Sequence, residues 1–338
     1  MKKKNRIKIV AEAGCNHNGN IRLAYKLIDY AKHANVDAIK FQLFTADETV
    51  TKFAKKANYA KLVTKSKQTQ YEMQKSLELT NEQHLKLKKY CKKKKIEYLS
   101  SAFDLPSLNF LNKLKIKQFK IPSGEIINYP YLRKVTSFKK KVVLSTGMST
   151  VSEISKAIKY LKKNGLKSKQ ITLLHCNSEY PTPFSDTNLR AMLYLKNKFK
   201  LPVGLSDHTL GIEVPIAAAA LGACFIEKHF TLDRNMIGPD HQASITPSEL
   251  KKMVISIRNI EKALGKFEKK VTKSERKNII VARKSIVAIK EIRKGQFFSK
   301  KNIGVKRPGT GISPTKFYDI LGKKAKKNFK YDEPIVIS

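Results

Sequence analysis

Two histidines, His208 and His229, are the residues whose type and spacing most directly indicate chemistry. Each ends a short apolar run, V-G-L-S-D-H and C-F-I-E-K-H, and a helix-like segment separates the two runs. Consecutive parallel strands that end in imidazoles place both rings at one rim of a sheet or barrel. Two imidazoles flanked by the oxygen donors Asp207 and Glu227 suit a labile divalent ion better than a closed zinc site. The pair predicts a metal-assisted enzyme; the alternative is two satisfied core histidines.

Polar residues within or after the other apolar runs extend this pattern. Lys40 and Lys120 lie inside apolar stretches, where an unpaired ammonium group is costly, so each needs an anionic partner. Hydroxyl groups such as those of Ser123 and Ser145 donate to phosphate oxygens. The set predicts a phosphorylated or carboxylated small molecule, and the absence of Walker A and G-x-G-x-x-G sequences argues against a nucleotide. Glu12 is the best candidate for acid–base chemistry; the alternative is a structural partner for a lysine.

The remaining histidines carry weaker signals. His17 follows the first apolar run, so we expect it near the site, with no role assigned. His33 and His84 fall within helix-like segments and are expected to face solvent.

The elements that must position these residues alternate from residue 7 to about residue 264. The expected strands are the short apolar runs Ile7–Ala13, Ala38–Leu43, Glu97–Phe103, Gln118–Pro122, Lys141–Ser145, Ile171–Cys176, Leu201–Ser206 and Cys224–Phe230. The expected helices are the amphipathic segments Ile21–Ala34, Asn81–Lys95, Val151–Lys163, Thr187–Phe199, Gly211–Leu221 and Pro247–Leu264. Eight such strands predict a (β/α)8 TIM barrel over residues 1–265, with a doubly wound sheet as the alternative. The polar connection 45–80 is long enough to predict a lid or a subunit contact.

The pattern changes after Gly265. Residues 266–281 are charged and lack a sustained apolar face, which predicts a linker. Residues 282–338 are β-like and small, at a size where cores are marginal, so we expect this domain to lean on a partner surface. Its expected elements are the strands Ser285–Ala288, Gln296–Phe298 and Asn302–Val305 and the helix Pro314–Leu321.

The net charge of +42 comes from 69 Lys and Arg against 27 Asp and Glu. Nucleic-acid binding is one interpretation, but the excess is spread along the chain, is mostly Lys and forms no stripe interleaved with aromatic residues. A lysine-rich surface that favours anionic substrates is the preferred interpretation. Lys8 interrupts the first apolar stretch, which argues against a signal peptide. The four cysteines form no C-x-x-C pair, which is consistent with a reduced protein. The longest apolar run is shorter than the roughly 20 residues of a membrane span. We therefore expect a cytoplasmic protein with no membrane or nucleic-acid partner.

Several ordered motifs are specific enough to identify a resemblance. They are E-A-G-C-N-H-N-G, I-K-F-Q, F-K-I-P-S-G-E, S-T-G-M, L-H-C-N-S-E-Y-P-T-P, G-L-S-D-H and E-K-H-F-T-L-D-R-N-M-I-G-P-D-H. Together they resemble the sialic acid synthases. The tail motifs V-A-R-K-S-I-V-A and K-R-P-G-T-G-I-S resemble the antifreeze-like (SAF) domain of that family, so the likeness covers essentially the whole chain.

The resemblance implies a transferase that condenses phosphoenolpyruvate with an open-chain N-acetylated aldose, releasing phosphate and giving a nine-carbon 2-keto acid. It implies a divalent ion on His208 and His229, most often Mn²⁺, with Mg²⁺ or Co²⁺ as alternatives. It assigns proton transfer to Glu12, with Lys40 and Lys120 as further catalytic groups. The implied phosphoenolpyruvate contacts are Lys120, Ser123, Ser145, Ser178 and Ser206. The implied sugar contacts are Gln42, Tyr180, Asp240 and Arg307.

In the same way, the resemblance implies a homodimer in which Arg307 of a swapped SAF domain reaches the barrel of the other subunit. Ser178 departs from the family, because some members carry there an Asn that binds phosphoenolpyruvate.

The tail S-E-R-K-N-I-I-V-A-R-K-S is closest to N-acetylneuraminate synthases, which use N-acetylmannosamine. Diacetyllegionaminate synthases, which use a 2,4-diacetamido-trideoxy-mannose, are the alternative, and the pseudaminate branch fits poorly. A binding module with a degenerate barrel would have lost Glu12, Lys120 and the two histidines, and all are present.

Overall fold

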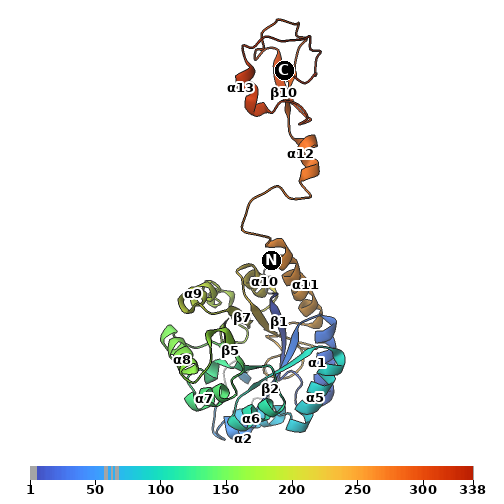
Figure 1. Cartoon of the computed structure of the whole chain (residues 1–338). Coiled ribbons are helices and arrows are strands. Elements are labelled where there is room, and N and C mark those ends of the chain that lie inside the picture. The colour runs from blue at the N-terminus through green and yellow to red at the C-terminus, as the bar shows by residue number, and fades with distance from the viewer. Residues whose placement is uncertain (1–5, 57–59, 62–63, 65–67, 338) are drawn as a thin grey trace. The chain divides into compact units, whose positions relative to one another are not determined.

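The computed structural model describes residues 6–56, 60–61, 64 and 68–337, and the chain divides into two compact units at Gly265 (Figure 1). Each unit is built around a hydrophobic core of its own. Within the described ranges, none of the helices has both the length and the apolar character needed to cross a bilayer.

The first unit is a closed barrel of eight parallel strands, which confirms the TIM-barrel prediction. The strands are β1 (Lys8–Gly14), β2 (Ala38–Leu43), β3 (Glu97–Ala102), β4 (Gln118–Ile121), β5 (Lys141–Ser145), β6 (Ile171–Cys176), β7 (Val203–Asp207) and β8 (Phe225–His229). Because β1 pairs with β2 on one side and with β8 on the other, the sheet has no free edge. This closure excludes the doubly wound alternative.

Helices surround the barrel in Figure 1. They are α1 (Ile21–His33), α2 (Ala46–Thr49), α4 (Gln70–Leu77), α5 (Asn81–Lys94), α6 (Leu105–Lys113), α7 (Tyr129–Ser137), α8 (Val151–Lys163), α9 (Arg190–Phe199), α10 (Glu213–Ala220) and α11 (Pro247–Ala263). Several begin with a capping box, in which a threonine hydroxyl accepts from the third helical N–H and a Glu or Gln side chain accepts from the threonine N–H, as at Thr80, Thr150 and Thr246. These caps satisfy backbone N–H groups at the start of each of these helices.

The barrel interior is layered, because side chains two residues apart on a strand point to the same side. A lower layer of apolar side chains forms one buried cluster: Val10, Ala38, Leu99, Val143, Leu174 and Phe225. Two residues further along each of these strands, the side chain is polar: Glu12, Lys40, Ser101, Ser145, Cys176 and Glu227. A ring of polar groups therefore lies directly above an apolar floor.

The second unit contains α12 (Arg276–Ala282), a two-stranded antiparallel sheet of β9 (Ser285–Ala288) and β10 (Ile303–Lys306), and the short helix α13 (Phe317–Ile320). The strand expected at Gln296–Phe298 is reduced to a single bridge between Phe297 and Lys324, so that prediction is wrong in extent. Part of the segment expected to be a linker is helical, because α12 occupies its end.

The structure corrects the prediction for one histidine. His84 is fully buried on α5, where it shares a face with Leu87 and Cys91, and its Nδ1 lies 2.7 Å from the Tyr98 hydroxyl. The spacing of three and seven residues could have indicated this buried face. His33 is exposed, as expected.

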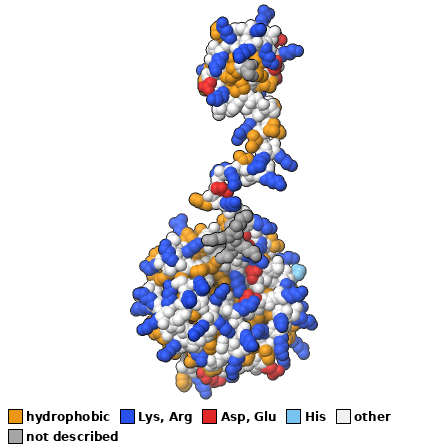
Figure 2. All heavy atoms as spheres, in the orientation of Figure 1, with side chains coloured by type: hydrophobic (Ala, Val, Ile, Leu, Met, Phe, Trp, Pro, Cys, Tyr) orange, Lys and Arg blue, Asp and Glu red, His pale blue; other side chains and the backbone are white. Residues whose placement is uncertain are grey.

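The basic charge is dispersed over the face shown in Figure 2. Lys and Arg side chains are scattered over the visible surface of each unit, with white and orange atoms between them, and do not gather in one stripe. This view agrees with a lysine-rich surface.

Candidate active site

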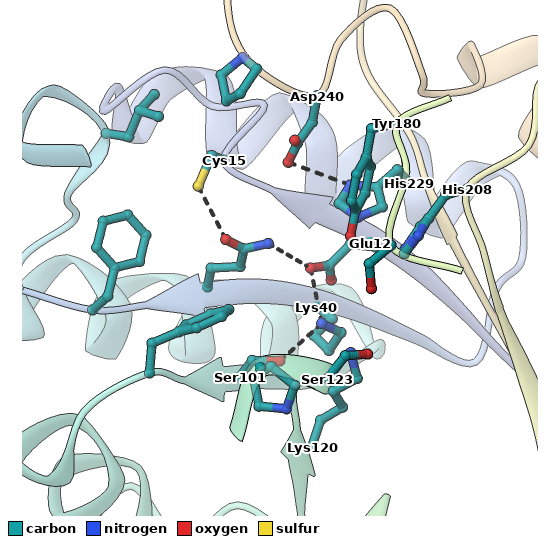
Figure 3. A pocket seen from close by; sticks show the side chains of 18 of the residues that line it. Glu12, Cys15, Lys40, Ser101, Lys120, Ser123, Tyr180, His208, His229 and Asp240 are labelled. Carbon is teal, nitrogen blue, oxygen red and sulfur yellow. Dashed lines mark hydrogen bonds and ion pairs between the residues drawn. The ribbon is translucent and has the colours of Figure 1, made fainter. Parts of the chain in front are cut away.

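A cavity of about 410 Å³ opens at the carboxyl ends of the barrel strands (Figure 3). Most of the residues predicted from the sequence line it: Glu12, Lys40, Gln42, Lys120, Ser123, Ser178, Tyr180, His208, His229 and Asp240. These residues come from β1, β2, β4 and β8 and from the segments that follow β4, β6, β7 and β8. The strand topology therefore brings together residues that are widely separated in the sequence.

Four predicted residues lie elsewhere. Ser145 and Ser206 are buried in the polar layer beneath the cavity, where the Ser206 hydroxyl donates to Glu227 Oε1 at 3.0 Å. His17 does not line the cavity, which corrects its expected place; it is buried with its ring centroid 6.2 Å from that of Phe41. Arg307 belongs to the second unit, directly after β10.

Two carboxylates and two lysines form a buried network across the polar layer. Lys40 Nζ lies 2.9 Å from Glu12 Oε1 and 3.6 Å from Glu227 Oε2, and Lys120 Nζ lies 3.1 Å from Glu227 Oε1. Glu12 is paired in register with Lys40 on β2 and with His229 on β8, which explains why these groups meet. Both lysines thus have the anionic partners that their apolar surroundings require.

The network shifts the pKa values of its two carboxyl groups in opposite directions. Burial raises the pKa of Glu12 to about 7, because the opposing attraction of Lys40 does not compensate for it, and Glu227 raises it further. Burial also disfavours ionised Glu227, but Lys120 and Lys40 outweigh burial and lower its pKa to about 2. Neighbouring acids whose pKa values are pushed apart are typical of acid–base sites. Glu227 is a fixed anion at neutral pH, whereas Glu12 can gain or lose a proton.

Sequence reasoning placed Glu227 beside the histidine pair but missed its ion pairs with both lysines. The signal was available, because Glu227 lies two residues before His229 on β8 and so faces the same side of the sheet.

The two histidines face one another across the rim of the cavity, with ring centroids 5.4 Å apart. His208 Nδ1 contacts the Asn177 carbonyl, and the Tyr180 ring stacks on His208 at 4.1 Å between centroids. His229 Nδ1 lies 3.7 Å from Asp240 Oδ2 and has no hydrogen-bond partner among the described residues. Burial and the neighbouring His208 lower the pKa of His229, so its imidazole is neutral at pH 7, as a metal ligand must be.

This donor set fits a divalent ion that keeps open coordination positions. No group of three or more His, Cys, Asp or Glu within the described residues could hold a metal. The protein would therefore supply the two imidazoles, and substrate or water would complete the coordination shell. Such an open arrangement is typical of catalytic rather than structural metal sites.

Lys120, Ser123 and Ser178 line the same cavity and form a candidate anion subsite. The Gly147 N–H donates to Ser123 Oγ at 3.0 Å, and a Cβ atom at position 147 would lie 2.3 Å from Ser178 Oγ. Two hydroxyl groups therefore converge on a glycine that cannot be replaced without movement of its neighbours. Hydroxyls with a nearby ammonium group are suitable donors for phosphate or carboxylate oxygens.

A second ion pair holds the two histidine strands together from the outer face of the barrel. Lys228 Nζ lies 2.6 Å from Asp207 Oδ2 and also contacts the Thr209 carbonyl, and both charged side chains are buried. Asp207 precedes His208 and Lys228 precedes His229, so the pair points outward where the histidines point inward. It is placed to fix the relative position of the two imidazoles.

We expect Lys228→Met to reduce the free energy of unfolding by about 3–5 kcal/mol, because it leaves the Asp207 carboxylate buried without a counterion. Denaturant unfolding followed by circular dichroism measures the change. Asp207→Asn in the same chain should restore part of the loss, since it removes the unpaired charge. The exposed Lys86, paired with Glu82 on α5, gives the matched control Lys86→Met, which should change stability little. Equal effects at the two positions would contradict this role for the buried pair.

The comparisons with known proteins agree with this architecture. Residues 27–269 match the NeuB family, and residues 283–338 match the SAF domain. The chain is 53% identical to the N,N'-diacetyllegionaminic acid synthase of Campylobacter jejuni, over 97% of this chain and 98% of the relative. It is 46% identical to the enzyme of the same name from Legionella pneumophila, over 95% of this chain and 90% of the relative. A crystal structure of N-acetylneuraminic acid (sialic acid) synthetase from Leptospira borgpetersenii superposes with a TM-score of 0.70 at 36% identity, covering 81% of this chain and 90% of that one.

Proposed function

Because this chain belongs to the NeuB family of sialic acid synthases, which condense phosphoenolpyruvate with an acetylated sugar, we propose that its own sugar is a 2,4-diacetamido-trideoxy-mannose. The product would be N,N'-diacetyllegionaminate, with release of phosphate. The observation that carries this choice is the 53% identity with the diacetyllegionaminic acid synthase, which extends over almost the full length of both chains.

A second candidate is the synthesis of N-acetylneuraminate from N-acetylmannosamine. The tail motif S-E-R-K-N-I-I-V-A-R-K-S favours it, and so does the likeness to the Leptospira borgpetersenii synthetase. The two sugars differ only at C4 and C6, so the reacting groups would engage the same catalytic residues in either case.

In the proposed reaction, C3 of phosphoenolpyruvate forms a bond to the aldehyde carbon while water adds at C2, and the C2–O bond to phosphate breaks. Lys120, Ser123 and Ser178 surround the anion subsite and would bind phosphoenolpyruvate, with Lys40, Ser145 and Ser206 supporting them from the buried layer. Glu12 would accept a proton from the attacking water, since a pKa of about 7 leaves a large ionised fraction at neutral pH.

Gln42, Tyr180 and Asp240 line the cavity around the histidines and would hold the sugar. A divalent ion on His208 and His229, for which Mn²⁺ is the first choice, would supply Lewis acidity toward the aldehyde oxygen.

We also propose a homodimer in which the SAF domain of one chain supplies Arg307 to the barrel of the other. The proposal rests on the family resemblance and on the small size of the second core. Light scattering of the purified protein should give twice the chain mass of 38.4 kDa; a monomeric mass would contradict the exchange.

The test of function is phosphate release from phosphoenolpyruvate with Mn²⁺ and each sugar in turn. We expect kcat/KM for the diacetamido sugar to exceed that for N-acetylmannosamine by at least about tenfold, which is the size of a single well-placed pocket contact. The reverse preference would favour the second candidate. Turnover of a simple aldose but of neither acetylated sugar would reject both.

A further inference from the structure

The cavity has a wall formed by one face of α4. Gln70, Met73, Gln74 and Leu77 are spaced three and four residues apart, which places them on one side of a helix, and all four line the cavity. Met73 and Leu77 are buried, whereas the two glutamines are half-buried. This helix belongs to the connection 45–80, for which the sequence predicted a functional role.

Two aromatic side chains complete the wall from the barrel side. Phe44 and Phe103 follow β2 and β3, line the cavity, and meet edge to face with centroids 6.2 Å apart. Phe44, Met73 and Leu77 pack in one buried cluster, with Phe103 against it. We call Phe44, Met73, Leu77 and Phe103 the α4 wall.

The α4 wall lies a short distance from the catalytic carboxylate. Cys15, which packs in the same cluster, donates from Sγ to Gln42 Oε1 at 3.3 Å, and Gln42 Nε2 donates to Glu12 Oε1 at 3.4 Å. Figure 3 shows this chain of contacts, from Cys15 at one side of the cavity to Glu12 near the histidines. Gln42 therefore links this cluster to Glu12, which is paired in register with His229. The α4 wall and the two histidines line the same cavity, so a sugar whose aldehyde lies at the histidines would extend its far carbons toward the wall.

The chemistry of the wall distinguishes substituents at those carbons. A hydroxyl group placed against thioether, leucine and phenyl groups loses its hydrogen bonds to water without replacement, whereas a methyl group gains contact. The adjacent carboxamides suit an amide substituent. The Gln74 carboxamide lines the cavity and lies 3.2 Å from the Thr49 hydroxyl oxygen, which holds the amide where it can form a hydrogen bond to an acetamido group.

We propose that the α4 wall is the specificity determinant for the far end of the sugar. It selects open-chain aldoses with a methyl group at C6 and an acetamido group at C4 over fully hydroxylated ones. The inference rests on the proposed function for the position of the aldehyde, and it deepens that function by assigning the choice of sugar to residues outside the catalytic network.

The test is the substrate preference of Met73→Gln, measured as kcat/KM for the diacetamido sugar divided by kcat/KM for N-acetylmannosamine. Glutamine is close to methionine in size and offers a hydroxyl group a hydrogen-bond partner. We expect the ratio to fall about tenfold from the wild-type value, within the range found for single contacts in apolar pockets. The matched control is Lys75→Gln, which places the same amide on the exposed side of α4, where Lys75 pairs with Asp47, and which should leave the ratio unchanged.

Each result of this test either supports or overturns the role of the α4 wall. A folded Met73→Gln protein with an unchanged ratio overturns the role of the wall while leaving the proposed function intact. A wild-type enzyme that prefers N-acetylmannosamine overturns both the wall and the proposed sugar, and one that turns over neither sugar overturns the proposed function itself. If Met73→Gln does not fold, Gln74→Leu replaces it. The KM for the diacetamido sugar should then rise several-fold with that for N-acetylmannosamine unchanged, and equal changes in both would reject the inference.

Discussion

Replacing His229 with alanine should lower metal-stimulated turnover by about 10³-fold or more. The two imidazoles lie with ring centroids 5.4 Å apart at the rim of the cavity, and within the described part of the chain they have no third His, Cys, Asp or Glu to complete a metal site. Removal of one would therefore take away half of the ligands proposed for the ion. Lewis-acid stabilisation is worth several kcal/mol, and each 1.36 kcal/mol corresponds to about a tenfold change in rate.

Two measurements distinguish the loss of a metal ligand from the loss of the folded structure in His229→Ala. Mn²⁺ binding by equilibrium dialysis should weaken strongly in His229→Ala, while the thermal midpoint in metal-free buffer should stay close to that of the wild type. His33→Ala is the matched control, because His33 is exposed on α1, and it should bind Mn²⁺ and turn over normally. Near-normal turnover of His229→Ala would remove this residue from the site.

Glu12→Gln should lower kcat by about 10²–10⁴-fold, the usual contribution of a positioned acid–base group. The amide keeps the size of the side chain but cannot take a proton from water. The pH dependence of kcat/KM gives a second readout. Because burial raises the pKa of Glu12 to about 7, the wild-type kcat/KM should fall as the pH drops below 7 and the carboxylate becomes protonated.

In the Glu12→Gln variant this inflection near pH 7 should disappear from the residual activity. Glu125→Gln provides a control, because the Glu125 carboxylate is half-buried, does not line the cavity and is not part of the buried lysine–carboxylate network. An unchanged pH profile in Glu12→Gln would assign the titration to another group. Activity that rises as the pH falls through 7 would instead identify Glu12 as a proton donor.

The barrel could be predicted because each strand is a short apolar run of its own. For β2, β5 and β6 the expected bounds agree with the structure, and the resemblance to sialic acid synthases is confirmed by the family match. The helices α6 and α7 were missed because each has only nine residues and a short apolar face. Their starts were nevertheless marked, since Asp104 and Asn128 cap helices whose first turn contains a proline.

The polar half of the site was predictable for the same reason as the strands. Residues two positions apart on a strand face one side, so polar residues at the ends of apolar runs had to converge. The α4 wall could not be found in this way. Met73 and Leu77 line the cavity because α4 packs against Cys15 and Phe44, and that packing depends on tertiary contacts between segments that are distant in the sequence.

The twofold alternation along β7 and β8 has a consequence for how this lineage can diversify. Deletion or insertion of one residue within either strand would exchange the inward imidazole with an outward charged side chain, so such events should be eliminated by selection. The helix α4 is not part of the sheet, so changes in its length or sequence do not shift the strand register. New sugar preferences should therefore arise by substitutions in α4, and related enzymes that make different products should differ there first.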